Sequence, residues 1–380
     1  MVDKNKVKIG FISWNNPNDR RTLSGTPYKI CEQLKNIGCE IIWIKVNRTY
    51  IYRIYNKVIS VYNKFARKRI DASHSVIGAS LQSNTIDDSL VSKCDIIFAP
   101  FVSEALYKLH TDKPIIYLSD ATFSIMVDYY FKNLTKCSIY QGNKIEKTAL
   151  NKAASIIVSS DWARNSVIND YHQPESKVHV IEFGANIDEK DIIPHKYNYN
   201  GHLDILFLGV DWKRKGGTIA VDCCRWLNDN GIPTTLHIVG IKHLDNSIAN
   251  LSFIDNAGFL NKNIPEQYNK LVSIIEKCHC LLLPTLAECS AIAFSESSAN
   301  GLPIFSHDTG GVRNYVEDGR NGYLLPIGST GKDFGNKIKD CLISGELEHL
   351  SETAKEVYKT KLNWQIWGSN VQEIIDQMYK

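Results

Sequence analysis

The sequence predicts an α/β protein made of two doubly wound parallel sheets in tandem. Short, nearly all-apolar runs alternate with helix-like segments through both halves of the chain, and such runs are typical of parallel strands covered on both faces. The alternation lapses over residues 188–203, which are polar, contain a proline and a glycine, and form the best linker candidate. A chain of 380 residues also exceeds the size at which one hydrophobic core usually stops growing, so two domains are expected.

The first half of the chain supplies the first expected sheet. Residues 26–38 have helical spacing and end at Gly38, a typical C-terminal stop. Strands are expected over residues 7–13, 40–46, 94–100, 114–120, 155–160 and 177–185. The first domain is therefore predicted to span residues 1–190.

The second half repeats this pattern and supplies the second expected sheet, in a domain predicted over residues 200–360. Helices are expected from about Gly217 to Asn230, over residues 265–277, and after Cys289. Strands are expected over residues 203–210, 234–240, 251–259, 278–284 and 302–308. Ligands of doubly wound sheets bind beyond the carboxyl ends of the strands, and two facing sheets would form one cleft.

The last residues, 361–380, are predicted to form a C-terminal helix with a strong apolar face. The apolar positions that carry this helical spacing are Trp364, Ile366, Trp367, Val371, Ile374, Ile375 and Met378. A face of this kind is typical of a helix that packs against the rest of the protein.

The composition is that of an ordinary globular protein, with 43% hydrophobic and 22% charged residues. A formal net charge of +3 gives no case for nucleic acid as a partner. The N-terminus lacks the apolar core of a signal peptide, and no run approaches the roughly 18 apolar residues of a spanning helix. Ten scattered cysteines without a CxxC pair suit reduced thiols, so a cytoplasmic protein is expected.

Cys278, His279 and Cys280 could suggest a metal site. They begin an apolar run that is typical of a buried strand, and the period of two would place His279 on the face opposite the thiols. The favoured interpretation is structural, and no metal site is predicted.

Two glutamates, Glu288 and Glu296, stand eight positions apart in an otherwise small and apolar segment. A strand ending in "FLGVDWKRKGG", a later one ending in "DNAGFLNK", this segment, and "VEDGRNGYLL" follow one another in the second half. In this order the features resemble the nucleotide-binding domain of retaining glycosyltransferases of family 4, the group 1 family with the GT-B fold. In the first half the resemblance is carried by "SGTPYKI", "SSDWARNSV" and "FGANID". It implies two Rossmann-like domains facing a cleft, with the C-terminal helix packing back across them.

The basic turn at residues 213–217 fits the diphosphate of a nucleotide-sugar donor. Diphosphates are bound by cations and by backbone N–H groups, and glycines let the backbone approach closely. The turn supplies Lys213, Arg214 and Lys215, followed by two glycines. By the resemblance, Lys215 is the phosphate-binding lysine and Arg214 its companion. The alternative is a solvated basic turn.

The two glutamates fit the sugar parts of the donor. One carboxylate can accept hydrogen bonds from both hydroxyls of a ribose. The resemblance gives that role to Glu296 and contact with the transferred sugar to Glu288. Between them, Cys289, Ser290 and Ala291 would offer backbone N–H groups at a helix start, where the family usually has glycine–aromatic–glycine. The alternative is a pair of exposed helix glutamates.

The remaining donor contacts are expected in three other loops. Phe259 and Leu260 would contact the base, although Phe259 could also be core filling. Gly310 and Gly311 permit a tight turn near the donor sugar. In the first domain, Gly25 would bring the backbone to the diphosphate, with a simple turn glycine as the alternative.

The resemblance also implies a mechanism. The leaving phosphate accepts the proton of the acceptor while the new bond forms on the same face, so Lys215, Arg214 and Glu288 would be catalytic. Asp120 stands where many family members carry a histidine, and it is the fourth catalytic candidate. No divalent metal and no cofactor beyond the donor substrate is expected.

The expected function is sugar transfer from a UDP- or GDP-activated donor to a glycan or lipid-linked acceptor, in surface polysaccharide biosynthesis. Two alternatives keep the donor site: a GT-B-type nucleotide-sugar epimerase, and a nucleotide-sugar-binding protein without turnover. The epimerase would need no acceptor cleft.

Residues 45–69 combine basic charge with an apolar helical stripe and contain no acidic residue. The basic residues are Lys45, Arg48, Arg53, Lys57, Lys64, Arg67, Lys68 and Arg69, and the apolar ones are Ile51, Ile54, Tyr55, Val58, Val61, Tyr62 and Phe65. A basic amphipathic helix is typical of a protein bound peripherally to an anionic membrane, here its inner face. The alternative is a helix that packs on its own sheet.

Overall fold

The computed structural model describes residues 6–20, 22–192 and 197–378, and it divides into two compact units. The first unit comprises Met1–Ile181 with Gly368–Lys380, and the second comprises Glu182–Trp367. Of the predicted linker, residues 193–196 lie outside the described residues, as do the first five residues of the predicted first domain and the last two of the C-terminal helix. The described part of the linker belongs to the second unit.

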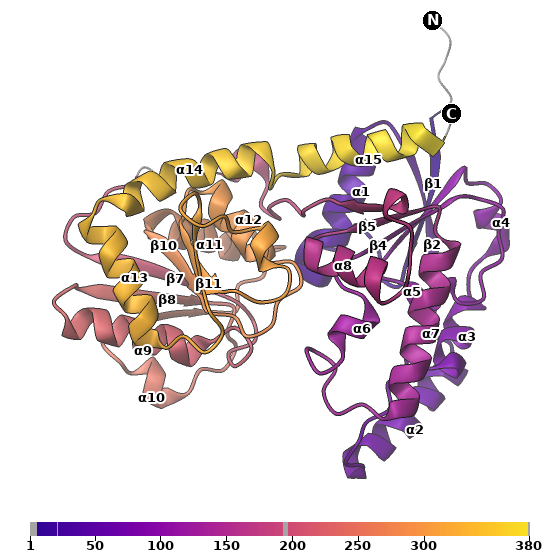
Figure 1. The fold of residues 1–380 in the computed structure, drawn as a ribbon, viewed down its shortest axis with the longest axis horizontal. Coiled ribbons are helices and arrows are strands. Elements are labelled where there is room, and N and C mark those ends of the chain that lie inside the picture. Colours follow the sequence, from indigo (N-terminus) through magenta and orange to yellow (C-terminus); the bar gives the residue numbers. More distant parts are fainter. Residues whose placement is uncertain (1–5, 21, 193–196, 379–380) are drawn as a thin grey trace, which may run out of the picture. The chain divides into compact units, whose positions relative to one another are not determined.

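In its described part, the first unit contains a six-stranded parallel sheet of order β2-β1-β3-β4-β5-β6 (Figure 1). The strands are β1 (Lys8–Ser13), β2 (Glu40–Lys45), β3 (Ile96–Pro100), β4 (Ile115–Ser119), β5 (Ser155–Val158) and β6 (Val178–Val180). β3, β4 and β5 are buried along their whole length, as parallel strands covered on both faces must be. All six lie where the sequence predicted strands.

Eight α-helices of the first unit are described before β6. They are α1 (Thr26–Asn36), α2 (Tyr50–Phe65), α3 (Val76–Ser83), α4 (Asp88–Val91), α5 (Ser103–Leu106), α6 (Phe123–Met126), α7 (Lys136–Lys152) and α8 (Asp161–Asn169). α1 begins after Gly25, which has a φ of 92°. Leu23 and Ser24 just before it also have positive φ, of 45° and 58°, so three successive residues hold a conformation that only glycine adopts readily.

The described part of the second unit contains another six-stranded parallel sheet, of order β12-β11-β10-β7-β8-β9. Its strands are β7 (Leu203–Leu208), β8 (Thr234–Val239), β9 (Ile254–Gly258), β10 (Cys280–Leu283), β11 (Ile304–His307) and β12 (Gly322–Leu325). The first five confirm the predicted strands, and β12 adds an edge strand that the sequence did not single out.

Six α-helices of the second unit are described in full. They are α9 (Gly217–Asp229), α10 (Asn246–Ala249), α11 (Pro265–Lys277), α12 (Ile292–Ala299), α13 (Gly331–Ile343) and α14 (Glu346–Thr360). The predicted helices after Gly217, over 265–277 and after Cys289 correspond to α9, α11 and α12. Buried apolar side chains of these helices and of the sheet form one core cluster, distinct from the core of the first unit.

The last helix, α15 (Trp364–Met378), begins in the second unit and ends in the first. At its start, the Nε1 of Trp364 donates a hydrogen bond of 3.1 Å to Oδ1 of Asn186. Near its middle, an added Cβ at Gly368 would lie 3.4 Å from side-chain atoms of Gln33 and Ile37, so the backbone here lies close to α1. The predicted C-terminal helix is thus confirmed, and each part of it packs within its own unit.

Each sheet has one place where neighbouring strands are not consecutive and the chain order reverses. In the first sheet this place lies between β1 and β3, and in the second between β7 and β10. The helices that follow the two strands there run over opposite faces of the sheet, which opens a crevice at the carboxyl ends of the strands. This topology fixes where a ligand site of each unit is to be sought.

Candidate functional site

The loops after β7 and β10 bring the predicted phosphate-binding residues and the first glutamate together. β7 and β10 pair in parallel, with Cys280 opposite Ile205 and Leu281 opposite Leu206. Residues 209–216 and 284–291 therefore leave neighbouring strands at the same edge of the sheet. Residues far apart in the sequence meet here because the order of the sheet reverses between these two strands.

Lys215 and Glu288 form an ion pair at this place. Nζ of Lys215 donates to Oε2 of Glu288, and the two residues are only 8% and 7% exposed. Arg214 lies beside them: its Nη1 is 3.5 Å from the same carboxylate oxygen and donates a 2.9 Å hydrogen bond to the carbonyl of Ala287. The alternatives of a solvated basic turn and an exposed glutamate are therefore wrong for Lys215 and Glu288.

The two loops are also joined through their backbones. The N–H of Leu286 donates to the carbonyl of Arg214 at 2.8 Å. Gly216, the residue before α9, has a φ of 72°, and a Cβ placed on it would lie 2.1 Å from the carbonyl oxygen of Pro284. Only glycine permits this approach, so Gly216 holds Lys215 against the loop that carries Glu288.

The end of β11 supports the loop after β10 from the other side. The Oγ of Ser306 donates to the carbonyl of Leu283 at 2.8 Å, and Nδ1 of His307 lies 3.0 Å from the carbonyl of Pro284. Both side chains are fully buried. The position of Glu288 is thus fixed by neighbouring strands as well as by its own loop.

Glu296 lies on α12 and is 3% exposed, so it too is not an exposed helix glutamate. Its carboxylate accepts from Nζ of Lys262, in the loop after β9. Lys262 was not predicted as a site residue, although it stands in the segment "DNAGFLNK" that carried the resemblance. Each glutamate of the pair therefore has a lysine partner from another loop.

The small residues of the predicted site lie around Glu288. Cys289 and Ala291 are buried, and Ala291 is the residue before α12, so 289–291 do lie at a helix start. The N–H of Gly311 donates to the carbonyl of Glu288 at 3.1 Å. Gly310 has a φ of 55°, the tight turn expected there.

The loop after β9 exposes an aromatic ring. Phe259 is 47% exposed, so the core-filling alternative is wrong, and Nζ of Lys242 lies 5.0 Å from the centre of its ring. Leu260 is half-buried and packs on the edge of the core. The ring offers an exposed flat apolar surface in the loop where a base was predicted to bind.

Gly25 and Asp120, the two site candidates of the first half, both belong to the first unit. Gly25 is buried and starts α1. Asp120 follows β4 and lines a cavity of about 120 Å³. The second-unit group of Lys215, Arg214 and Glu288 is thus formed without them.

The cavity beside Asp120 contains a charged network that the sequence did not reveal. His74 and Glu104 also line it, with His74 Nδ1 2.8 Å from Asp71 Oδ2 and Nε2 3.3 Å from Glu104 Oε1. Burial lowers the pKa of His74, but the charges of Glu104 and Asp71 and the hydrogen bond to Asp71 raise it by more, to about 9. Burial raises the pKa of Glu146, on the same cavity wall, to about 7.

The side chain of His279 has a structural role, which agrees with the favoured interpretation of residues 278–280. Its Nδ1 accepts from the N–H of Asp204 at 3.0 Å, and its Nε2 lies 3.2 Å from the carbonyl of Asn198. The side chain therefore joins the start of β10 to that of β7. In residues 6–20, 22–192 and 197–378, no group of three or more His, Cys, Asp or Glu side chains is arranged to hold a metal ion.

Comparison with known proteins identifies similar sequences and similar folds. Residues 188–357 match the family model described as "Glycosyl transferases group 1". An uncharacterized glycosyltransferase of Methanocaldococcus jannaschii is 25% identical over 239 residues, which make up 63% of this chain and 64% of that relative. The chain thus spans just under two thirds of this relative's length.

Two solved structures extend the likeness over the whole chain. The crystal structure of a glycosyltransferase from Rickettsia africae has a TM-score of 0.69 at 14% identity and covers 99% of both chains. Anabaena HepE in complex with UDP and glucose has a TM-score of 0.62 at 13% identity and covers 97% of this chain and 99% of its own. The fold is therefore GT-B, and the family match and the relatives support the glycosyltransferase superfamily for this chain.

The close approach at Gly216 predicts a stability difference between two glycine variants. Gly216→Ala and Gly231→Ala share the strain of a positive φ, 72° and 79°, but nothing lies within 4 Å of a Cβ at Gly231. The clash with Pro284 should therefore cost Gly216→Ala roughly 1 to 3 kcal/mol more in the free energy of unfolding. Chemical denaturation measures both values, and equal losses would show that the two loops are not locked together here.

The network around His74 predicts a pH dependence of stability. A histidine whose pKa is raised from 6.5 to about 9 stabilises the folded state below pH 6.5, and this contribution is lost as the pH rises through 9. The charges of Glu146 and His74 interact, so the comparison is made without Glu146: between pH 7 and pH 9.5, Glu146→Gln should lose more of its free energy of unfolding than the double variant His74→Gln, Glu146→Gln. Denaturant titrations at several pH values test this, and parallel curves for the two proteins would refute it.

Proposed function

We propose that this protein is a retaining, metal-independent glycosyltransferase that uses a UDP- or GDP-activated sugar. The observation that carries the proposal is the buried Lys215–Glu288 pair at the reversal point of the second sheet, with Arg214 beside it. Burying two charges costs more than most ion pairs return, so such a pair is more easily understood as a ligand site than as a stabilising device. HepE, which shares the fold, was solved with UDP and glucose.

The roles of the individual residues follow from the parts of the donor. Lys215 and Arg214 bind the diphosphate, and Lys215 exchanges its partner Glu288 for a phosphate oxygen when the donor enters. Glu288 is then available to the hydroxyls of the transferred sugar. Glu296, which is paired with Lys262 in this structure, accepts hydrogen bonds from the ribose hydroxyls, and the exposed ring of Phe259 supports the base.

The chemistry requires no protein nucleophile. The bond between the sugar C1 and the phosphate oxygen breaks while C1 bonds to the acceptor oxygen on the same face. The proton of the acceptor hydroxyl passes to the leaving phosphate, so the atoms and charges balance. Lys215 and Arg214 stabilise the charge that grows on the leaving diphosphate, which is the main electrostatic contribution of the chain.

The direct experiment is a panel of nucleotide sugars with glycan and lipid-linked acceptors. Release of one nucleotide coupled to formation of a glycoside with the anomeric configuration of the donor supports the proposal. A product that is still a nucleotide sugar with one inverted carbon indicates the epimerase alternative. Tight binding without any turnover indicates the binding-protein alternative.

The donor assignments predict different effects for two variants. Glu296→Ala should weaken UDP or GDP binding roughly 10- to 100-fold, because charge-assisted hydrogen bonds to the ribose are lost. Lys215→Ala should lower kcat more than it raises the KM for donor, because the leaving diphosphate carries more charge than the bound one. Calorimetry and steady-state kinetics measure these effects.

Glu266→Ala is the matched control, since Glu266 is an exposed glutamate of the same unit on α11. It should leave nucleotide affinity unchanged. Unchanged affinity in Glu296→Ala as well would remove the ribose assignment, and a wild-type kcat in Lys215→Ala would remove its catalytic role.

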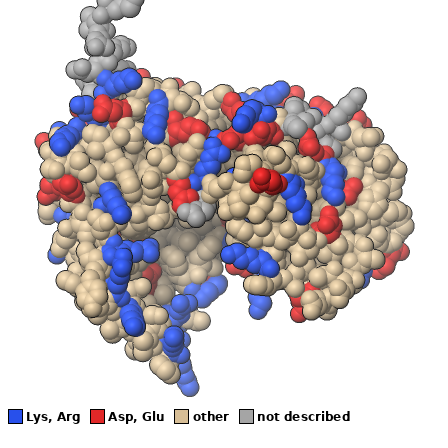
Figure 2. Space-filling model, turned by 180° about the vertical axis from the view of Figure 1, so that it is seen from behind, with Lys and Arg blue, Asp and Glu red and all other residues tan. Residues whose placement is uncertain are grey.

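We also propose that the first unit binds an anionic membrane surface through α2. Six of the seven predicted apolar positions of this helix are exposed, among them Val58 at 60% and Phe65 at 87%, while Tyr52 is its one buried residue in the described structure. Packing on its own sheet therefore does not account for this face. Basic side chains gather at the end of the first unit to which α2 projects (Figure 2). No described helix is long and apolar enough to cross a bilayer.

The membrane proposal predicts that removing exposed apolar side chains abolishes vesicle binding without affecting folding. The triple variant Ile54→Ser, Val58→Ser, Phe65→Ser should sediment at least about tenfold less with phosphatidylglycerol vesicles, because each side chain would lose apolar burial. Its melting temperature should stay close to that of the wild type.

The control is a triple serine variant of exposed isoleucines elsewhere on the surface, at Ile77, Ile327 and Ile343. It should sediment like the wild type, and rising salt should weaken binding of both proteins. A wild type that ignores anionic vesicles even at low salt would end the membrane proposal.

A further inference from the structure

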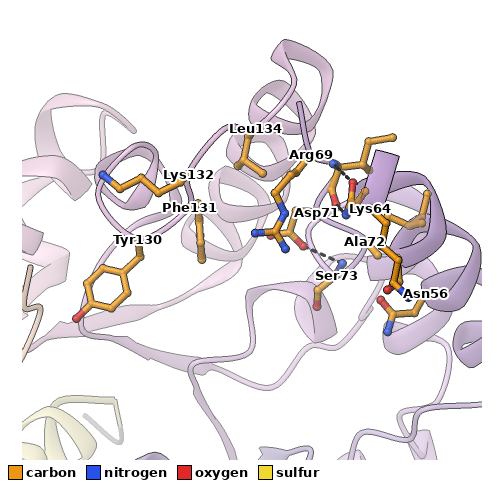
Figure 3. Close-up of a pocket in the computed structure, with 14 residues that line it drawn as sticks. Asn56, Lys64, Arg69, Asp71, Ala72, Ser73, Tyr130, Phe131, Lys132 and Leu134 are labelled. Carbon is orange, nitrogen blue, oxygen red and sulfur yellow. Dashed lines mark hydrogen bonds between the residues drawn. The ribbon is translucent and has the colours of Figure 1, made fainter. Parts of the chain in front are cut away.

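The side of α2 opposite its apolar face forms one wall of a polar cavity. Asn56, Ser60 and Lys64 follow one another at a spacing of four residues and so share one side of the helix. The other walls are the segment 69–73 after α2 and the segment 130–134 before α7 (Figure 3). The cavity has a volume of about 520 Å³ and lies entirely within the first unit.

Three cations from three different segments line this cavity: Lys64, Arg69 and Lys132. Nζ of Lys132 donates to the carbonyl of Asp128. Across the described part of the chain, no acidic side chain forms an ion pair with any of the three. The lining therefore carries three exposed cations for which no described carboxylate provides an ion-pair partner.

The one carboxylate in the cavity wall, Asp71, is already engaged. Its Oδ1 accepts from the N–H groups of Ser73 and His74 at 2.9 and 3.1 Å, and its Oδ2 lies 2.8 Å from Nδ1 of His74. His74 is charged at neutral pH because its pKa is raised to about 9 by Glu104 and Asp71 against the effect of burial. Asp71 thus already has partners, and among the described residues it forms no ion pair with Lys64, Arg69 or Lys132.

Hydrogen bonds order the backbone of the two loop segments that carry Arg69 and Lys132. The N–H of Arg69 donates to the carbonyl of Asn133 at 2.7 Å, and the N–H of Thr135 donates to the carbonyl of Arg69 at 2.9 Å. The two loop segments are therefore paired like neighbouring parallel strands. The side chain of Asn63 binds both the N–H and the carbonyl of Ile70, at 2.8 and 2.9 Å. Such preorganisation lowers the cost of ordering a site on binding.

The remaining lining suits a sugar ring. Asn56 and Ser60 offer an amide and a hydroxyl, which can bond to ring hydroxyls, and Tyr130 and Phe131 offer aromatic faces to the apolar C–H side of a ring. The cations suit a phosphate or a carboxylate. We propose that this cavity binds an anionic sugar, one that carries a phosphate or carboxylate group, as part of the acceptor glycan. This inference rests on the proposed function as a glycosyltransferase and names its acceptor class.

A bilayer headgroup is a poorer occupant of this cavity. Ile54 and Val58 of the exposed apolar face each lie two residues from Asn56, which corresponds to about 200° around a helix. A membrane that covers the apolar face would therefore leave the cavity side of α2 in water, where a glycan can enter.

Ligand-observed NMR with glucose 6-phosphate, glucuronate, glucose and inorganic phosphate tests the proposal. The wild type should bind the two anionic sugars at least about tenfold more tightly than glucose or inorganic phosphate. The double variant Arg69→Gln, Lys132→Gln should lose most of this preference. The control Arg67→Gln, Lys68→Gln removes the same charge from residues that do not line the cavity and should keep it.

Several results would overturn the proposal. Equal binding of glucose 6-phosphate and inorganic phosphate would show an anion site without a sugar. Equal losses in the two double variants would show a general charge effect, and displacement of glucose 6-phosphate by phosphatidylglycerol vesicles would show a headgroup site. UDP and GDP binding is measured separately in the same samples. If the wild type binds neither nucleotide but still prefers anionic sugars, that result counts against the proposed donor site alone.

Discussion

The buried pairing of Lys215 with Glu288 is the interaction on which the rest of the second unit's site depends. Two charges removed from water cost on the order of several kcal/mol each, and losing one partner of such a pair costs about 3 to 5 kcal/mol. The two residues can form this buried pair because β7 and β10 are neighbouring strands, and the loops that follow them leave the sheet at the same edge. Gly216 brings the two loops together, and Ser306 and His307 support the loop after β10.

The first unit also has a group of charged side chains near the carboxyl ends of its strands, but with a different arrangement of charge. Glu104 on α5 and Asp120 after β4 line one cavity, and the segment before α3 brings His74 to it. Here carboxylates surround a histidine, whereas in the second unit cations surround a carboxylate. Both sheets are parallel and have one reversal point each, but the charge patterns near these points are opposite.

The sequence predicted those features that depend on local pattern. All six strands of the first sheet, five strands of the second, and the helix beginning at Gly217 were recognisable because apolar runs and glycine positions are local signals. The closeness of Lys215 to Glu288 was predicted only through the resemblance to a family. The resemblance alone left open whether Glu288 is buried, and the structure settles this because it shows which strands are neighbours.

Other features could not have been predicted, because they join residues without any shared local pattern. Lys262 meets Glu296 across two loops, and His74 meets Glu104 from another part of the chain. The cavity lined by Lys64, Arg69 and Lys132 forms where the segment after α2 pairs with the segment before α7, through a bridge between Arg69 and Leu134. These two bridged residues lie more than 60 positions apart in the sequence. The amphipathic pattern of α2 was visible in the sequence, but only the structure shows that its apolar face is exposed.

A crystal structure of the protein with UDP or GDP bound would test the central claim most directly, through the position of the diphosphate. The account predicts a phosphate oxygen within hydrogen-bond distance of Lys215 Nζ, with the carboxylate of Glu288 turned away from that lysine. It also predicts the ribose hydroxyls on Glu296, with Lys262 displaced. A diphosphate bound elsewhere, with the Lys215–Glu288 pair intact, would contradict the account.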